Sequence, residues 1–188
     1  VVVVAGTATP GLGDVSVFSA SQGETVKSNG FTYTVASIAV SGPAFGPMPF
    51  GAVRTNMYTV TNSGTEALLI LGTTNAGAGA AMFDVSAIPA TVAAGTASNF
   101  PVVFTASAVG TFTPAVHVAN NGLVADYVFD VTGHVYQTST NAGPFAGGNV
   151  VTITNGHFGT ITNVLVGGVA ATILDSGANW VTIAMPSA

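Results

Sequence analysis

Residues 57–65 read MYTVTNSGT, and the fold class can be inferred from this stretch. Apolar and polar residues alternate from Tyr58 to Thr61, which is the two-residue period of a half-buried β-strand. The run ends at Asn62-Ser63-Gly64, whose residue types are typical of a turn. The stretch therefore predicts a strand followed by a turn, a unit from which antiparallel sheets are built.

The same pattern recurs along the chain, where short runs of Val, Ile, Thr, Phe and Tyr alternate with Gly, Asn, Pro and Ser. We find no amphipathic helix, and we interpret the Gly-rich stretch Gly72–Gly79 as a loop. Many short strands at regular spacing predict an all-β protein made of immunoglobulin-like β-sandwiches in a tandem array. The predicted strands are Asp14–Phe18, Phe31–Ile38, Met57–Thr61, Ala67–Leu71, Phe100–Thr105, Thr113–Ala119, Tyr127–Thr132, Val150–Thr154, Asn163–Val166, Ala170–Leu174 and Trp180–Met185.

Composition excludes several classes of protein. Hydrophobic residues make up 48% of the 188 residues and charged residues 5%, whereas a disordered chain is poor in apolar residues and rich in charge. No apolar run approaches the roughly 20 residues of a membrane-spanning helix. Lys27 and Arg54 are the only basic residues apart from histidine, too few to bind the phosphates of a nucleic acid. Cysteine is absent, which excludes disulfides and thiolate metal sites.

The low charge also bears on partners. A folded chain with two basic and seven acidic residues has a surface dominated by Thr, Ser, Asn, Gly and Ala. Such a surface suits packing against neighbouring copies, or a coat of O-linked glycans on Ser and Thr. The alternative is a secreted module with an ordinary neutral surface. No Asn-x-Ser/Thr acceptor occurs, so any glycosylation is expected to be O-linked.

Three histidines are the first candidates for chemistry. His117 lies in an alternating strand, His134 follows a glycine at a strand end, and His157 lies in a turn. A zinc site needs several ligands brought together, and the sequence gives no such cluster. We expect solvated or locally hydrogen-bonded imidazoles.

The acidic residues are the second candidates. Asp126 and Asp130 lie four apart in one predicted strand, so they share a face. They could act as an acid–base pair or bind calcium, but no third ligand is near, and we interpret them as a solvent-facing sheet edge. Asp14 is interpreted as a turn acceptor. No nucleophile motif is present, and Gly72–Gly79 lacks the lysine of a phosphate loop. The sequence therefore predicts no enzyme, and no catalytic, cofactor-binding or metal-binding residues.

Aromatic residues offer a possible platform for sugars. Trp180, Phe145, Phe158 and Tyr136 all lie in the last third of the chain. For Phe158 we expect core packing, and for Trp180 partial exposure or contact with a neighbour.

Residues 35–136 resemble the choice-of-anchor D domain, an immunoglobulin-like family related to the ASPM/Hydin repeats. One departure is Ala106, which stands where that family has a proline. The motifs that carry the resemblance are Phe50-Gly51, Met57–Thr65, Ala67–Ile70, Phe83–Val85, Ile88–Gly95, Phe104-Thr105, Gly110–Phe112 and Phe129–Gly133.

The remaining residues resemble two parts of an IPT/TIG domain, another immunoglobulin-like fold of surface proteins. Residues 137–188 correspond to its N-terminal part, through Gly143–Gly148, His157–Gly159 and Val166–Ile173. Residues 1–34 correspond to its C-terminal part, through Pro10–Val17 and Asn29–Thr34. Val1–Ala8 aligns without gaps with Val181–Ala188, so we expect both to be the same strand of the domain.

These resemblances imply a structural repeat unit of an extracellular filament, stalk or giant adhesin, located outside the cell or at its surface. The partners would be copies of the chain or adjoining repeats, joined head to tail through composite IPT/TIG domains. The alternatives are a glycan- or protein-binding surface module and an accessory domain of a larger secreted enzyme. For the middle module we predict two antiparallel sheets, with these side chains mostly buried: Tyr58, Val60, Leu69, Phe83, Val103 and Phe129.

Overall fold

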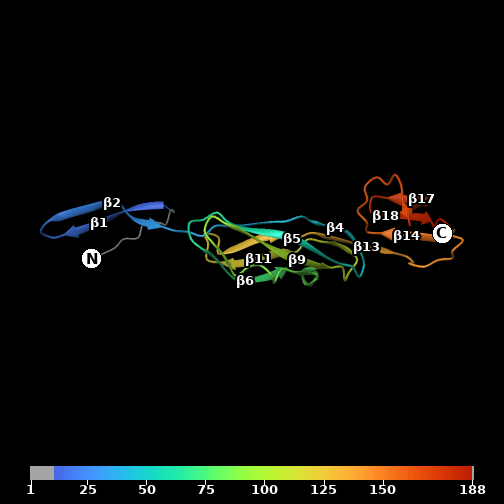
Figure 1. Cartoon of the computed structure of the whole chain (residues 1–188), viewed down its shortest axis with the longest axis horizontal. Helices are drawn as coiled ribbons and strands as arrows, with labels where there is room; N and C mark the ends of the chain where they lie inside the picture. The colour runs from blue at the N-terminus through green and yellow to red at the C-terminus, as the bar shows by residue number, and fades with distance from the viewer. Residues whose placement is uncertain (1–10, 188) are drawn as a thin grey trace.

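A computed structural model describes residues 11–187, so Val1–Ala8 and its predicted equivalence with Val181–Ala188 fall outside the described residues. Within this range the protein is all-β, as predicted, and its only helix is a three-residue 3₁₀ turn, Ala80–Met82. Figure 1 shows an elongated molecule with a β-hairpin at one end, a sandwich in the middle and a small sheet region at the other end.

The N-terminal hairpin consists of β1 (Gly11–Ser19) and β2 (Gly23–Tyr33), which pair only with each other within residues 11–187. Their antiparallel register shifts between Gly13 and Val15, so β2 bulges opposite Asp14. The Asp14 carboxylate accepts a hydrogen bond of 2.8 Å from the backbone N–H of Asn29, which has a left-handed φ of 54°. Asp14 therefore acts as a backbone acceptor, as predicted, and it holds the bulge.

The middle body is a sandwich of two four-stranded antiparallel sheets. The first has the order β3 (Ile38–Ser41), β5 (Val53–Asn62), β9 (Ala97–Thr105), β7 (Phe83–Asp84). The second has the order β12 (Asp126–Asp130), β11 (Ala115–Asn120), β6 (Leu68–Ala76), β8 (Thr91–Val92). The core between them is aromatic at one end, where the rings of Phe83 and Phe104 stack with centroids 4.4 Å apart.

A third strand group links this body to the C-terminal region. β13 (Gly133–Thr138) pairs in its first half with β10 (Gly110–Phe112) and, in parallel, with β4 (Phe45–Pro49). In its second half it pairs with β14 (Val150–Thr154) through Gln137 and Thr138. One strand thus belongs to both regions, and backbone hydrogen bonds continue from one to the other.

The C-terminal region has two small sheets that face one another. The larger part continues from β14 to β18 (Trp180–Ala184) and β17 (Thr172–Gly177). The smaller is a two-stranded ribbon of β15 (Leu165–Val166) and β16 (Val169–Ala170). Three residues are buried between them, Val151, Val181 and Ile183.

The burial predictions for the middle module are mostly confirmed. Tyr58, Val60 and Phe83 are buried, and Val103 and Phe129 are half-buried. The prediction that Leu69 is buried is wrong, because Leu68 faces the core and the two-residue period of β6 turns Leu69 outward. Its backbone N–H is instead bonded to the Asn121 side chain.

Two element predictions also need correction. The predicted strand Phe31–Ile38 is the end of β2 and the start of β3, separated by four residues outside any strand. The predicted loop Gly72–Gly79 continues β6 as far as Ala76 before the chain turns. The parallel pairing of β4 with β13 was not predicted, because its sequence Gly46-Pro47-Met48-Pro49 is typical of a loop.

Candidate functional site

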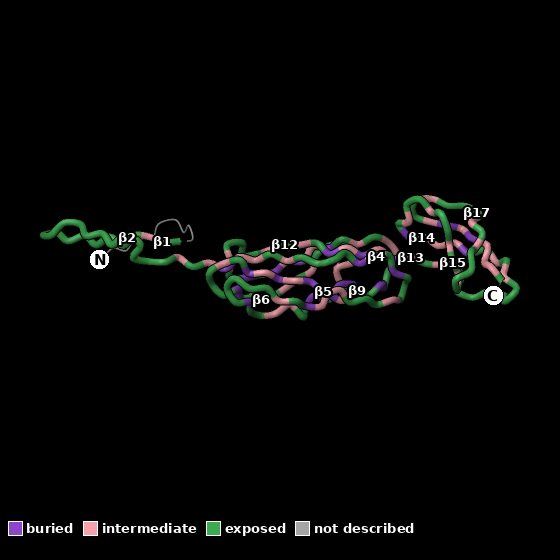
Figure 2. Tube along the Cα trace, turned by 45° about the horizontal axis from the view of Figure 1, so that its top comes forward, coloured by how far each residue is buried: buried purple, intermediate pink, exposed green. Residues whose placement is uncertain are grey.

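The hairpin is the most exposed part of the described chain. Figure 2 shows it as a nearly continuous exposed tube, in contrast to the buried segments of the middle body. Its large apolar side chains include Phe18, which is 73% exposed, and Phe31, which is 55% exposed. An isolated two-stranded hairpin is at best marginally stable in water. The hairpin therefore exposes hydrophobic surface of the kind that normally faces another sheet.

One face of the hairpin is more apolar than the other. Gly13, Val15 and Val17 alternate along β1 and share this face. Phe31 pairs directly with Gly13, and its ring lies 4.9 Å from the ring of Tyr33 in an edge-on contact. We call Val15, Val17, Phe31 and Tyr33 the apolar face of the hairpin.

The opposite face of the hairpin mixes apolar and acidic groups. Asp14, Ser16 and Phe18 alternate with the residues of the apolar face along β1, and Glu24 pairs with Phe18. Both carboxylates of the hairpin therefore lie away from the apolar face. Burial of an unpaired charge is costly. The apolar face carries one charged residue, Lys27 opposite Val15, and the other face carries two, so the apolar face is the side better suited to contact with another sheet.

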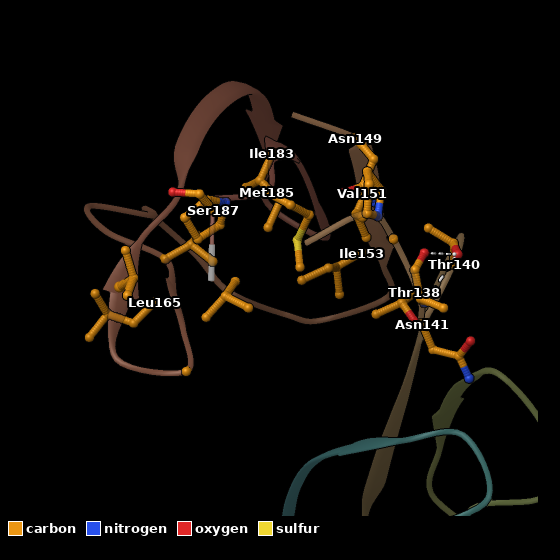
Figure 3. Close-up of a pocket in the computed structure, with 18 of the residues that line it drawn as sticks. Thr138, Thr140, Asn141, Asn149, Val151, Ile153, Leu165, Ile183, Met185 and Ser187 are labelled. Atoms are coloured by element: carbon orange, nitrogen blue, oxygen red, sulfur yellow. Dashed lines mark hydrogen bonds between the residues drawn. The ribbon is translucent and has the colours of Figure 1, made fainter. Parts of the chain in front are cut away.

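At the other end of the molecule an open groove of about 880 Å³ is lined by the sheet β14–β18, the β15–β16 ribbon and residues of the segment 138–145 that leads from β13 to β14. Figure 3 shows Val151 and Ile153 of β14 directed into the same space as Ile183 of β18 and Met185 just beyond it. Val164 and Val166 contribute from the ribbon side, and none of the lining residues is ionisable. The groove is thus a neutral, mostly apolar space open to solvent.

The groove is the unfilled part of a small sandwich. Ile153, Val164, Val166 and Met185 pack against its three buried residues yet stay only half-buried. No residue of β17 lines the groove, whereas β14 and β18 both do. Within the sheet β14-β18-β17, the strands β14 and β18 are therefore the ones left open to the groove.

The histidines lie in two different places. The Nδ1 atom of His117 lies 2.9 Å from an Asp126 carboxylate oxygen on the neighbouring strand. His134 of β13 and His157 of the loop after β14 come together, with ring centroids 4.3 Å apart. Both contact the Thr111 hydroxyl, His134 at 3.1 Å. The prediction of locally bonded imidazoles is confirmed, but the sequence did not indicate that two of them meet.

Protonation of His134 is disfavoured. Burial lowers the pKa of His134 below its ordinary 6.5, and repulsion from His157 lowers it further. The Thr111 hydroxyl has one proton and two lone pairs, so it can donate to only one of the rings. Within the described residues, no group of three or more His, Cys, Asp and Glu side chains is arranged to hold a metal ion.

The remaining candidates are surface residues. Asp126 and Asp130 are both exposed on β12, an edge strand of its sheet, as predicted. Phe145 is 79% exposed and lines the groove. Phe158 packs against the small C-terminal core, and Trp180 is half-buried. The described part of the chain contains no helix long and apolar enough to cross a membrane.

Among solved structures, the chain resembles other proteins at low sequence identity. No family model matches the chain, and no curated protein matches it. A solved protein of unknown function from Porphyromonas gingivalis W83 has a TM-score of 0.43 at 13% identity, covering 70% of this chain and 69% of that one. The E. coli chaperone DraB has a TM-score of 0.36 at 12% identity, covering 80% and 86%. The Salmonella enterica SafA pilin in complex with the SafB chaperone has 0.34 at 15%, covering 80% and 85%.

Proposed function

We propose that this chain is a non-catalytic structural repeat unit of an extracellular filament, stalk or giant adhesin, and that its copies join head to tail. The observation that supports this most is the state of its two ends. A hairpin with an uncovered apolar face lies at one end, and a sandwich with an open apolar groove lies at the other.

The energetics favour an assembled state. Uncovered apolar surface is rare in soluble monomers and usually marks an interaction site. Burial of one Val or Phe side chain is worth about 1.5–3 kcal/mol, and the hairpin and groove each offer several. A contact between the hairpin and the groove would remove the apolar surface of both from water.

The geometry favours an open assembly over a closed one. The hairpin and the groove lie at opposite ends of the molecule (Figure 1), so they do not meet within one chain. A contact between two different surfaces is heterologous, and it propagates into a filament unless its rotation closes a ring. The rod-like shape of the chain suits the filament.

The sequence resemblances fit the same scheme. If the C-terminal region and the hairpin are two parts of one IPT/TIG domain, their contact completes that domain. The middle sandwich, which resembles choice-of-anchor D, is then a rigid spacer between successive composite domains. Such arrays occur at cell surfaces, where a sparsely charged Ser- and Thr-rich exterior suits O-linked glycans.

A second candidate function is binding of a glycan or protein at the groove. Phe145 is the observation that favours it, because this exposed ring lies at the groove wall and sugars stack on exposed aromatic rings. In that case the groove would bind a soluble ligand in place of a second copy of the chain.

The test is the association state of the purified chain. Sedimentation equilibrium over a 100-fold concentration range should give a mass that rises with concentration beyond a dimer. Negative-stain electron microscopy should show unbranched rods with a regular axial repeat. A chain that stays monomeric at millimolar concentration would contradict the proposal, and a screen of glycans against the same sample tests the second candidate.

A further inference from the structure

We propose that the hairpin of one copy adds to the free edge of β15 in the next copy through its strand β1. The product is a four-stranded sheet in the order β16-β15-β1-β2, which closes over β14 and β18. This inference rests on the proposed head-to-tail assembly and specifies its contact at the level of strands.

The position of the ribbon decides which of its edges is free to accept a strand. Only Ala171 separates β16 from β17, so the chain passes directly from the ribbon to the edge of the sheet below. Both residues of β15 line the groove, whereas β16 contributes only Val169 and β17 contributes none, so β15 is the ribbon strand on the side of the groove. β15 therefore points its other edge towards the space above β18 and β14, where the groove is open.

The hairpin in turn has one edge better suited to pairing. β2 bulges around Asn29 and carries both Glu24 and Lys27. Bulges and charged residues, lysine above all, are features that block the addition of a further strand at a sheet edge. β1 has a single charged residue, Asp14, and its carboxylate is already bonded within the hairpin. The edge of β1 is therefore the one that pairs.

The side chains then match face to face. With β1 beside β15, the apolar face of the hairpin lies over Val151, Ile153, Ile183 and Met185 in the groove. Asp14 and Glu24 lie on the outer face, in water. Lys27, which pairs with Val15, belongs to the outermost strand, so its ammonium group can reach solvent past the rim of the groove.

The outer face gives a matched pair of probes. Ser16 of β1 and Val26 of β2 are direct cross-strand partners, so they lie at the same height on the same face. Leu165 of β15 is exposed and lies at the rim of the groove, and its side chain alternates along the strand with that of Val166, which packs against the core. In the composite sheet Ser16 lies one strand from Leu165, and Val26 lies two strands away.

Two substitutions on β1 test which face enters the groove. Val17→Lys places a charge on the apolar face and should weaken association at least tenfold. Ser16→Lys places the same charge on the outer face of the same strand and should leave association within about twofold of the unchanged chain. The hairpin contributes nothing to the core of the middle body, so the middle body of both variants should unfold at the same temperature as that of the parent. Equal weakening by the two variants would overturn the assignment of the face.

Cysteine cross-linking tests which strands are adjacent, and the chain has no cysteine of its own. A Leu165→Cys chain is mixed with a Ser16→Cys chain or, as the matched control, a Val26→Cys chain, and each mixture is oxidised under assembly conditions. We expect the Ser16→Cys mixture to form the disulfide-linked heterodimer at least tenfold faster.

The outcomes separate this inference from the proposed function. Faster cross-linking by Val26→Cys would assign the pairing to β2 and overturn the inference. Assembly without a preferred cross-link at either position would also overturn it, while the head-to-tail proposal would stand. Failure of the parent chain to associate at all would overturn both.

Discussion

Asn62 is buried, yet every hydrogen-bonding group of its side chain has a partner. Its carbonyl oxygen accepts from the backbone N–H groups of Ser37 and Gly64, and its amide donates to the carbonyl oxygens of Glu66 and Val92. The side chain lies at the end of β5 and thus connects that end to the residues just before β3 and β6 and to the end of β8. The sequence correctly predicted a turn at this asparagine, but not its partners, because 25 and 30 residues separate it from Ser37 and Val92.

The His134–His157 pair is the other residue-scale feature with a measurable consequence. Thr111 and His134 belong to the middle body, whereas His157 comes from the loop after β14. The three side chains therefore join the two regions next to the shared strand β13. Protonation of both rings would place two positive charges against one hydroxyl group.

We predict that this junction loses stability in mild acid. Since the pKa of His134 is lowered in the folded protein, the unfolded chain binds more protons below pH 6.5. The stabilising effect of the neutral ring is complete above that pH and is lost as the pH falls towards the folded-state pKa. Thermal unfolding between pH 7.5 and 5 should show a declining midpoint.

The control compares two histidine variants. His134→Gln removes the titrating group and should flatten the pH dependence, whereas His117→Gln, on strand β11 of a different sheet, retains His134 and should keep the decline. Identical pH profiles for the parent and His134→Gln would contradict the prediction.

At the scale of single elements, most strands were predictable from local sequence, because Val, Ile, Thr and aromatic residues mark them and Asn-Gly pairs end them. The predicted run Val150–Thr154 coincides with β14. In the hairpin, β1 and the end of β2 were predicted as strands. The first part of β2 was not predicted, because the run Glu24–Asn29 has no alternation of apolar and polar residues. Strand β4 was missed because its pairing with β13 is a contact across almost 90 residues.

The candidate surfaces, like the strands, could be predicted from local sequence only in part. The sequence predicted most of the strands in the N-terminal hairpin and the C-terminal region. Which side of the sandwich remains open depends on where the ribbon lies relative to β14, β17 and β18. That is a property of tertiary packing, and no local pattern encodes it.

Gly133 is the glycine whose absence of a side chain matters most for the shared strand. A Cβ atom at this position would lie 2.4 Å from the ring of Phe104. That ring is buried and stacked on Phe83, so it cannot move aside. The start of β13 therefore has to be glycine for the strand to lie against the core.

We predict that Gly133→Ala destabilises the protein by about 1–3 kcal/mol, the usual cost of overpacking a core. Gly72→Ala is the matched control, since Gly72 is also in a strand and its Cβ position has nothing within 4 Å. The control should change the free energy of unfolding by less than about 0.5 kcal/mol. Urea unfolding measures both, and equal values for the two variants would show that the close approach to Phe104 is not a constraint.

At the scale of the whole molecule, the distribution of buried residues separates a stable centre from dependent ends. Eighteen buried residues form the core of the middle body, and three form that of the C-terminal region. The hairpin has no buried residue among those described. We therefore expect the middle body to fold by itself and the ends to depend on the contact proposed between them.

The chemistry of that contact predicts its response to salt. No residue lining the groove is ionisable, and the apolar face of the hairpin adds only Lys27 at its margin. At 1 M salt the Debye length is about 3 Å, so an association driven by surface charge would be weakened strongly. We predict that the dissociation constant from sedimentation equilibrium changes less than about twofold between 0.05 and 1 M sodium chloride. Sodium sulfate should tighten the association, because excluded salts favour burial of apolar surface. A tenfold loss of affinity in sodium chloride would instead mean that charged groups hold the copies together, and the hairpin and groove would then not be the surfaces that meet.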